Sequence, residues 1–403
     1  MREETMSLEL SKKAQAVKPS STLAITAKAK ELKAKGIDVA SFGAGEPDFN
    51  TPDNINEAAV KAIWDGFTKY TVASGTKELK EAVCRKFKKD NNLDYKPSQI
   101  VVSNGGKHSL TNIFNAILNP LDEVIIPIPY WLSYSEIVKL SDGVPVYIIG
   151  EKTRQYKVTA KQIEDAITDR TKVLILNSPS NPTGMLYTRE ELEEIADVVV
   201  RNDIYVLSDE MYEHLLYDDA KHISIASLNE EIYKRTITCS GVAKSYAMTG
   251  WRIGFTASTE ELARVMGNLQ SHQTSNPNSI AQKAAEEALN GSQETVENMR
   301  QEFDKRRKFM ANRIAAMPYV DALTPQGAFY FFVDISEVLK KTYKGQDMRD
   351  ANEVAHILLN DYKVAVIPCV DFGCKDHIRL SYATSLDEIE KGLDRIENFL
   401  KEL

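Results

Sequence analysis

The stretch TKVLILNSPSNPTG at residues 171–184 is an apolar run that ends in a polar turn. A helical pattern, REELEEIADVVVRN at 189–202, follows it, and a second apolar run, IYVLSDEMY at 204–212, comes next. Runs that are mostly apolar, and not strictly alternating, are typical of strands covered on both faces. The strand–helix–strand order predicts a mostly parallel sheet with helices on both sides.

The same alternation extends along the chain on both sides of this stretch. The apolar runs QIVVSNGG at 99–106 and DEVIIPIPY at 122–130 each precede a helical pattern, and further runs lie at 235–241 and 250–258. Ligands of open α/β sheets bind beyond the carboxyl ends of the strands. We therefore predict an α/β fold whose functional side chains follow the ends of these runs.

The last third of the chain has a different pattern. Helical periodicity dominates from residue 260 to Pro318, and the strand-like runs GAFYFFVDI, KVAVIP and HIRLSYA then precede a closing helix. This order predicts a smaller α+β domain, and a chain of 403 residues usually forms two domains. We place a large domain at 46–300 and build the small domain from 301–403 together with 1–45.

Composition narrows the classes of function. The formal net charge of −8 disfavours nucleic acid, which selects basic surfaces. No apolar run is long enough to span a membrane, and MREETMSLEL at the start has no apolar segment of a secretory signal. The six histidines show no metal-ligand spacing, so we predict no metal. The cysteines form no CxxC pair, which indicates reduced thiols and a cytoplasmic protein; they are Cys84, Cys239, Cys369 and Cys374.

Two glycine-containing stretches fall short of known nucleotide-binding motifs. SNGGKHSL lacks the P-loop pattern because Val101 and His108 stand where a glycine and a Ser or Thr are required. FGAGEPDF has Asp48 in place of the third glycine of a dinucleotide fingerprint. Gly105 and Gly106, at a strand end before a helix, still form a plausible phosphate cradle. An ordinary strand-to-helix turn explains the two glycines as well.

Six pieces of the sequence, in this order and spacing, resemble the class I aminotransferases, which are pyridoxal-phosphate enzymes of the aspartate aminotransferase fold. The resemblance runs from about Pro19 to the end of the chain, and it is closest to the bacterial-type subgroup, some of whose members also use prephenate. The pieces are GAGEPDF, YTVASGTKELKEAV, NSPSNPTG, SDEMYEHLLY, AKSYAMTGWRIGF and HIRLSYA.

The resemblance implies the fold type I of pyridoxal-phosphate-dependent transferases. It also implies a ping-pong transfer of an amino group from L-aspartate or L-glutamate to a 2-oxo acid such as 2-oxoglutarate. A bifunctional aspartate/prephenate aminotransferase and a lyase of the same fold remain alternatives, because a lyase shares Lys244, Asp209 and Arg252. A regulator with an appended DNA-binding domain is disfavoured, since only about forty residues precede GAGEPDF.

The resemblance assigns catalytic and cofactor-binding roles to residues of this chain. Lys244 would hold pyridoxal 5'-phosphate as a Schiff base, and Arg252 would clamp the phosphate and, as a neighbouring cation, lower the pKa of the lysine. Asp209 would pair with the ring nitrogen, although Asp also favours helix N-caps. Tyr212 and Asn181 would bind the phenolic oxygen, and Asn181 could also serve as a turn residue.

Further positions complete the cofactor site that the resemblance implies. Trp131 would stack on the ring, or pack in the core as most tryptophans do. The phosphate would be held by Gly105, Gly106 and Lys107. Many relatives carry a phosphate-binding serine where this chain has Gly241, and Ser240 is the candidate to replace it.

The substrate-binding residues come from the same resemblance. Arg379 would bind the α-carboxylate with help from the backbone of Gly45, and Lys107 with Thr22 would bind a second carboxylate. The ordinary roles of a solvated lysine and an N-cap threonine stay open for Lys107 and Thr22. Trp131 and Asn181 would also face the substrate. Tyr70 would reach the cofactor phosphate of a neighbouring subunit, which implies a homodimer with shared active sites.

Overall fold

We describe the protein from a computed structural model that covers residues 9–19 and 21–403. In the described part of the chain, the largest sheet has seven strands, in the order β2 (Ile100–Ser103), β8 (Gly254–Ala257), β7 (Thr236–Gly241), β6 (Tyr205–Asp209), β5 (Thr171–Asn177), β3 (Glu123–Ile128) and β4 (Val144–Ile149). Neighbouring strands from β7 to β4 run parallel, and β8 is antiparallel to both of its neighbours. The prediction of a mostly parallel sheet is confirmed.

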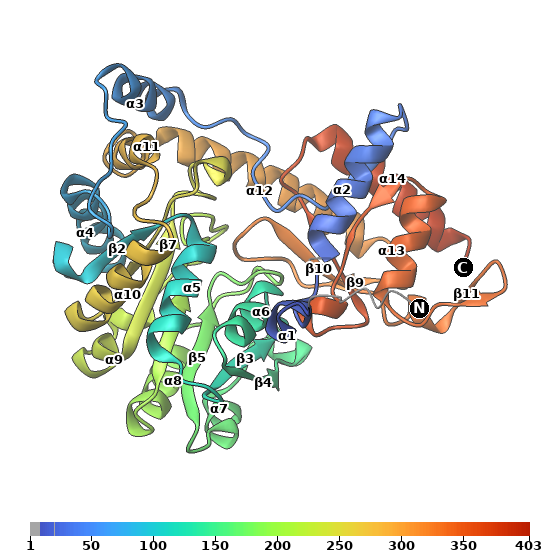
Figure 1. Cartoon of the computed structure of the whole chain (residues 1–403). Coiled ribbons are helices and arrows are strands. Elements are labelled where there is room, and N and C mark those ends of the chain that lie inside the picture. Colours follow the sequence, from blue (N-terminus) through green and yellow to red (C-terminus); the bar gives the residue numbers. More distant parts are fainter. Residues whose placement is uncertain (1–8, 20) are drawn as a thin grey trace, which may run out of the picture.

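Helices cover both faces of this sheet (Figure 1). Val173 and Ile175 of β5 pack in one apolar cluster with α5 (Gly106–Ile117), α6 (Ser133–Leu140) and α10 (Glu260–Gln273). Leu174 and Leu176, on the other face, pack with α7 (Ala160–Ala166), α8 (Arg189–Arg201) and α9 (Glu230–Arg235). Successive side chains of a strand point to opposite faces, so a strand that is apolar at every position requires cover on both. A further cluster joins α3 (Asp53–Trp64), α4 (Lys77–Asn91) and α11 (Ser279–Asn290).

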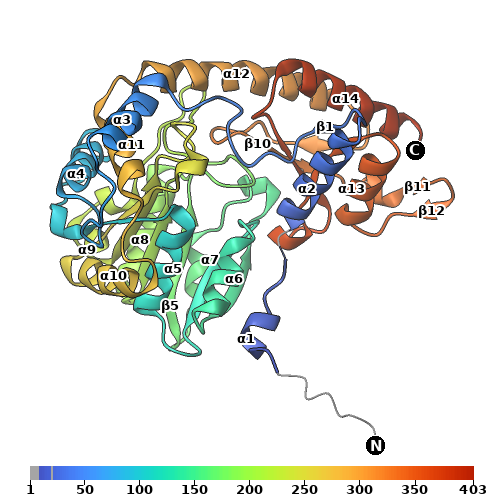
Figure 2. The same ribbon diagram turned by 45° about the horizontal axis from the view of Figure 1, so that its top comes forward.

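A second sheet forms the core of the C-terminal part. Its four strands lie in the order β14 (Ile367–Pro368), β15 (His377–Ser381), β10 (Tyr330–Asp334) and β9 (Asp321–Ala322), all pairs antiparallel. The helices α13 (Ala351–Asn360) and α14 (Leu386–Lys401) lie beside it, and the long helix α12 (Glu294–Ala315) connects it with the larger part (Figure 2). The hairpin of β11 (Thr342–Tyr343) and β12 (Gln346–Asp347) projects from this part.

The N-terminal segment lies with the C-terminal part of the chain. Helix α2 (Ser21–Ala34) packs near β13 (Val364–Ala365) and β14, and β1 (Ala40–Ser41) pairs in parallel with β13. The short helix α1 (Lys12–Gln15) precedes them and lies near α6. Helix α12 runs through residue 300 without a break, so the predicted domain boundary falls inside a helix, and the division into 46–300 and 1–45 with 301–403 stays a prediction.

Across residues 9–19 and 21–403, no helix combines the length and the apolar character that crossing a bilayer requires.

Candidate active site

A cavity of about 340 Å³ lies at the carboxyl ends of β5, β6 and β7. This volume is within the range of small-molecule sites. The cavity receives side chains from the large sheet, from α2 and from β10 and β15 of the second sheet. Most of the residues that the sequence predicted for the site line it together: Thr22, Gly45, Gly106, Lys107, Trp131, Asn181, Asp209, Tyr212, Lys244, Arg252 and Arg379.

Lys244 follows β7 and points into this cavity, where its Nζ donates to the carbonyl oxygen of Gly45 at 2.5 Å. Desolvation by the surrounding protein lowers the pKa of Lys244 to about 8. Glu46 opposes this shift, whereas the cations Arg379 and Arg252 add to it. A lysine with such a pKa holds a substantial fraction of neutral, nucleophilic amine near neutral pH.

The lowered pKa of Lys244 predicts how the cofactor-free protein reacts with an acylating reagent. Only the neutral amine attacks, so the labelling rate at Lys244 is expected to rise with pH through about 8 and then level off. An ordinary lysine would continue to gain reactivity up to about pH 10.4. Quantitative peptide mapping after brief labelling at each pH measures this, with Lys221 as a second lysine of the same chain. A midpoint for Lys244 equal to that of Lys221 would contradict the prediction.

Asp209 is the last residue of β6 and is buried under the cavity floor. Burial raises the pKa of Asp209 to about 6, and two hydrogen bonds act in the opposite direction. The phenol of Tyr134 donates to Oδ2 at 2.5 Å, and the backbone N–H of Met211 donates to Oδ1 at 3.2 Å. The two hydrogen bonds stabilise the ionised carboxylate in a buried position. A buried carboxylate of this kind suits pairing with a protonated ring nitrogen.

Ser240 lies in β7, and its hydroxyl does not point into the cavity. It donates to Oε1 of Glu213 at 2.8 Å. Glu213 also forms an ion pair with the ammonium of Lys86 at 2.5 Å and accepts a hydrogen bond from the side-chain amide of Asn91 at 2.8 Å. Burial opposes the charged form of Glu213, but Lys86 holds its pKa well below the usual range. The structure does not bring Ser240 together with the predicted cofactor residues, because Glu213 binds its hydroxyl.

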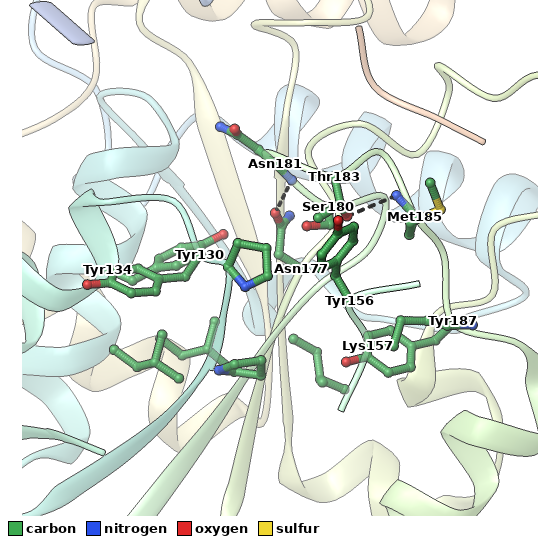
Figure 3. Close-up of a pocket in the computed structure, with 15 residues that line it drawn as sticks. Tyr130, Tyr134, Tyr156, Lys157, Asn177, Ser180, Asn181, Thr183, Met185 and Tyr187 are labelled. Carbon is green, nitrogen blue, oxygen red and sulfur yellow. Dashed lines mark hydrogen bonds between the residues drawn. The ribbon is translucent and has the colours of Figure 1, made fainter. Parts of the chain in front are cut away.

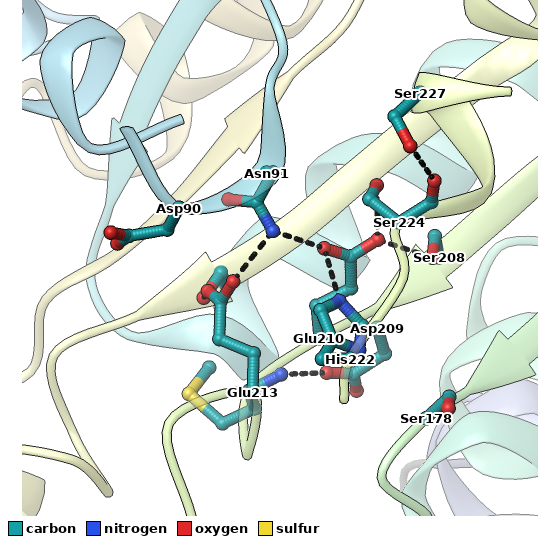
Figure 4. Close-up of polar contacts among 12 residues, drawn as sticks. Asp90, Asn91, Ser178, Ser208, Asp209, Glu210, Glu213, His222, Ser224 and Ser227 are labelled. Atoms are coloured by element: carbon teal, nitrogen blue, oxygen red, sulfur yellow. Dashed lines mark hydrogen bonds and ion pairs between the residues drawn. The ribbon is translucent and has the colours of Figure 1, made fainter. Parts of the chain in front are cut away.

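Glu210 and His222 lie beside Glu213 in the same buried polar cluster (Figure 4). Ligand atoms of these three residues lie within 4.8 Å of one another. His222 Nε2 is 3.0 Å from Glu210, and although burial lowers the pKa of His222, Glu210 raises it above its ordinary value. His222 and Lys86 thus supply the positive charge that the two carboxylates need, and we assign no metal to the cluster. The cluster supports the turn that carries Asp209.

A glycine cradle lies beside the N-terminus of α5. A Cβ on Gly105, whose φ is +88°, would lie 2.4 Å from Nη2 of Arg252, and a Cβ on Gly254 would lie 2.5 Å from the backbone nitrogen of Gly106. Arg252 donates to the carbonyl oxygen of Thr249 at 2.8 Å, which directs the guanidinium toward the cradle. A helix N-terminus with an adjacent guanidinium binds phosphate well, so this place fits a phosphate group.

Aromatic side chains line the middle of the cavity. Trp131 lies edge-on to Tyr134 with 5.5 Å between ring centroids. The hydroxyls of Tyr212 and Tyr330 are 3.1 Å apart. Tyr212 thus has a partner that fixes its hydroxyl at the cavity wall.

Arg379 is a buried cation with spare hydrogen-bond donors. Its side chain is 2% exposed, and Nη1 donates to Oδ1 of Asn181 at 2.9 Å. Among the residues that the structure describes, Nε and Nη2 find no hydrogen-bond partner. The guanidinium lies over the ring of Tyr330, 4.2 Å from its centroid. Buried charged donors require a partner, and a planar fork of this kind matches a carboxylate.

Lys107 and Thr22 also line the cavity. The ammonium of Lys107 lies 5.1 Å from the ring centroid of Trp131. Partial burial and the nearby charge of Arg252 lower the pKa of Lys107. Thr22 has a buried hydroxyl oxygen without a hydrogen-bond partner in the described part of the chain. A cation and a hydroxyl therefore face the same space as Arg379.

Tyr70 lies outside this cavity. Its side chain is 88% exposed on the loop between α3 and α4. Tyr70 is not among the described residues that line the cavity. Gly105 does not line it either, but it lies in the glycine cradle next to Arg252.

The sequence missed two tyrosines that contact the predicted residues. Tyr134 was part of the helical pattern WLSYSEIVKL, and Tyr330 was part of the strand GAFYFFVDI. Each is buried, as its apolar neighbours predict. The signal that could have found them is a tyrosine hydroxyl in a buried position, because such a group requires a hydrogen-bond partner.

Comparison with known proteins agrees with this geometry. The sequence profile described as Aminotransferase class I and II matches residues 37–396. An aspartate aminotransferase of Bacillus sp. (strain YM-2) is 52% identical over 97% of this chain and 99% of its own length. A probable aspartate/prephenate aminotransferase of Rickettsia conorii is 46% identical over 96% and 97%. The aspartate aminotransferase of Thermus thermophilus, solved with maleate, is 41% identical with a TM-score of 0.92, covering 98% of this chain and 100% of its own. The chain belongs to the class I and II aminotransferase family.

Proposed function

We propose that this protein is an aspartate aminotransferase that uses pyridoxal phosphate. The observation that carries the proposal is Arg379, which lines the same cavity as Lys244 and whose buried Nε and Nη2 have no hydrogen-bond partner in the described residues. An anchor for a carboxylate beside a nucleophilic lysine suits an amino-acid substrate. Names of relatives point to the same activity, since a 52% identical protein is an aspartate aminotransferase.

The residues present fit pyridoxal phosphate. The glycine cradle with Arg252 suits its phosphate, Asp209 its ring nitrogen, and Lys244 its aldehyde carbon. Tyr212 and Asn181 would bind its phenolic oxygen, and Trp131 would lie on its ring. When bound, the cofactor supplies a ring that accepts electrons from the substrate α-carbon.

Residues of the chain then divide the work of the reaction. Arg379 binds the α-carboxylate and fixes the orientation of the α-carbon. The amine of Lys244 takes the α-proton onto Nζ and later returns it to another carbon, as a base with a pKa near the working pH does well. Asp209 stays negatively charged and stabilises positive charge on its partner. After release of a 2-oxo acid, the same residues act in reverse on the acceptor.

The second carboxylate of the substrate would bind to Lys107 and Thr22. Lys107 and Thr22 line the same cavity as Arg379, so two anchors would select a dicarboxylate. The Thermus thermophilus relative, solved with maleate, is consistent with this choice. Prephenate is a second candidate acceptor, because the Rickettsia conorii relative is a probable aspartate/prephenate aminotransferase.

A panel of amino donors tests the function. Each L-amino acid is incubated with the enzyme, pyridoxal phosphate and 2-oxoglutarate, and glutamate formation is followed. We expect aspartate to be the best donor, and prephenate to be tested as an alternative acceptor with aspartate. Turnover of an amino acid in the absence of any 2-oxo acid would instead identify a lyase. Loss of glutamate formation from aspartate, with another donor active, would overturn the substrate assignment.

Replacing Lys107 by alanine is expected to impair aspartate selectively. The variant loses the partner of the second carboxylate, which costs about 1–3 kcal/mol, or roughly fivefold to 150-fold in kcat/KM. Phenylalanine lacks that carboxylate and should be affected little. The measurement is kcat/KM for both donors in the wild type and in Lys107→Ala, with Lys221→Ala as a surface control. Equal losses for both donors would mean that Lys107 serves the cofactor alone.

We also propose a homodimer whose active sites are shared. Exposed apolar side chains gather on α3 and the loop after it, and a surface of this kind marks a protein interface. They are Val60, Ile63, Trp64, Tyr70 and Val72. A second copy of the chain would cover them and bring its Tyr70 toward the phosphate cradle. We place the enzyme in the cytoplasm, where its cysteines, free thiols in the described residues, stay reduced.

Hybrid dimers test the sharing of sites. A chain with Tyr70→Phe is mixed with a chain carrying Lys244→Ala after reversible dissociation. If Tyr70 acts across the interface, one site of the hybrid lacks both groups and the other is intact, so the mixture gains activity over either parent. Isolated hybrids purified by two different tags provide the measurement. Hybrids no more active than the parents would show that each chain uses its own Tyr70.

A further inference from the structure

Tyr134 is a buried tyrosine whose hydroxyl contacts the carboxylate at the centre of the proposed site. It lies on α6 with 2% of its surface exposed. Its hydroxyl donates to Oδ2 of Asp209 at 2.5 Å, and its ring lies edge-on to Trp131. The hydroxyl and the ring thus reach two different residues of the site.

The groups around Asp209 act in opposite directions on the charge of its carboxylate. Burial disfavours the charged form of the Asp209 carboxylate, and so does the neighbouring negative charge of Glu210. The favourable contributions come from the Tyr134 hydroxyl, the backbone N–H of Met211 and the positive charge of Lys244. Hydrogen bonds to a charged form stabilise it, and the bond from Tyr134, at 2.5 Å, is shorter than the bond from Met211, at 3.2 Å.

We propose that Tyr134 is a positioning residue for the reaction: its hydroxyl keeps the carboxylate of Asp209 ionised and turned toward the cofactor ring. The inference rests on the proposed function, because it gives Asp209 the ring nitrogen as its partner. Met211 fixes Oδ1 from the backbone and Tyr134 fixes Oδ2, so the two donors hold both oxygens of one carboxylate. Without the phenol, Asp209 would become protonated at a higher pH, and the N–H of Met211 would hold only one of its two oxygens.

A second cavity limits which substitutions are informative. Its lining includes Tyr134, Asn177 and Asn181 (Figure 3), and the same three residues line the cavity of the proposed site. These three side chains are therefore shared between the two cavities. A small residue at 134 would join the cavities and disturb Trp131 as well. Phenylalanine keeps the ring and removes only the hydroxyl.

The test compares three side chains at position 134 with graded donor strength. Tyrosine is the reference. Phenylalanine, in Tyr134→Phe, has no hydroxyl to donate, and 3-fluorotyrosine installed in place of Tyr134 is a stronger hydrogen-bond donor than tyrosine. The first readout is the pH titration of 13C-labelled aspartate carboxyls by NMR in the full-length cofactor-free protein, with Asp209→Asn used to assign the signal. The second is the pH profile of kcat/KM for aspartate.

We expect the two substitutions to shift Asp209 in opposite directions. The phenylalanine variant should titrate about one pH unit higher, a tenfold change in proton affinity, and the fluorinated protein should titrate lower. The acidic limb of the kcat/KM profile should move in the same directions. Tyr187→Phe is the matched control: this buried phenol accepts the N–H of Val158 at 3.2 Å, lines the second cavity and does not contact Asp209.

Two results would overturn the proposal. One is an Asp209 titration that Tyr134→Phe leaves unchanged. The other is a shift of the same sign for the phenylalanine and fluorotyrosine proteins, which a purely structural disturbance would give. Failure of the proposed function looks different: the wild type would transfer no amino group from any donor, while the titration of Asp209 would still respond to position 134.

Discussion

Replacing Lys244 by alanine is expected to lower kcat/KM for aspartate by a factor of about 10⁴ or more. The variant loses the amine that moves the α-proton, a role that contributes about 10²–10⁴-fold, and it also loses the nucleophile that attaches the cofactor. Arg379 and Arg252 remain, so substrate and phosphate can still bind. The measurement is single-turnover kinetics with aspartate, together with cofactor binding followed by absorbance.

A second variant and a labelling experiment make this test specific for Lys244. Lys244→Arg keeps the positive charge but has no neutral amine at neutral pH, so it should be as inactive as the alanine variant. Borohydride reduction of the wild-type enzyme with bound cofactor, followed by peptide mapping, should place the cofactor on Lys244. Finding it on Lys107, the other lysine that lines the cavity, would refute the assignment.

Changing Asp209 to asparagine is expected to reduce turnover about 10²–10³-fold while the cofactor still binds. Asparagine has the same shape but no charge, so the ring nitrogen loses the group that keeps it protonated. Removal of one preorganised electrostatic partner costs about 2.7–4 kcal/mol. The loss should appear in kcat more than in KM, because Arg379 still holds the substrate. Steady-state kinetics and cofactor titration of the purified variant provide the measurement.

Glu210 supplies the control for the Asp209 variant. It is the adjacent carboxylate, fully buried and bonded to Ser208, Ser224 and His222 without lining the cavity. Glu210→Gln should lower the free energy of unfolding, because a buried hydrogen-bonded carboxylate is lost. Its loss in kcat should be smaller than the loss caused by Asp209→Asn. Near-full turnover of Asp209→Asn, or equal kinetic losses in the two variants, would show that Asp209 is not the partner of the ring nitrogen.

The sequence was sufficient to predict the sheet and much of the cavity. Apolar runs such as 171–177 must be covered on both faces, and this requirement alone predicts a parallel sheet with two layers of helices. The carboxyl ends of neighbouring parallel strands share one edge, so Asn181, Asp209 and Lys244 had to come close together. Their meeting in one cavity follows from topology. The roles of these residues came from the family resemblance, and they stay predictions until tested.

The remaining features depend on side-chain direction, which no local pattern determines. Ser240 precedes Gly241 in β7, and successive residues of a strand face opposite sides, so its hydroxyl reaches Glu213 in place of the cradle. Tyr134 looks like any apolar position of an amphipathic helix until its hydroxyl is seen to contact Asp209. Tyr70 is exposed on the single chain, so the role proposed for it requires a second copy of the chain.

The pairing of β1 with β13 has a consequence for the order of events during synthesis. Ala40 and Ser41 leave the ribosome early, but their partners Val364 and Ala365 are made close to the end of the chain. Folding during translation proceeds from the N-terminus, domain by domain. The large sheet, after whose strand β7 Lys244 follows, can form before β13 has been synthesised and β1 can pair with it. Arg379 emerges later still, so a nascent chain acquires its reactive amine before it acquires the group that admits a substrate.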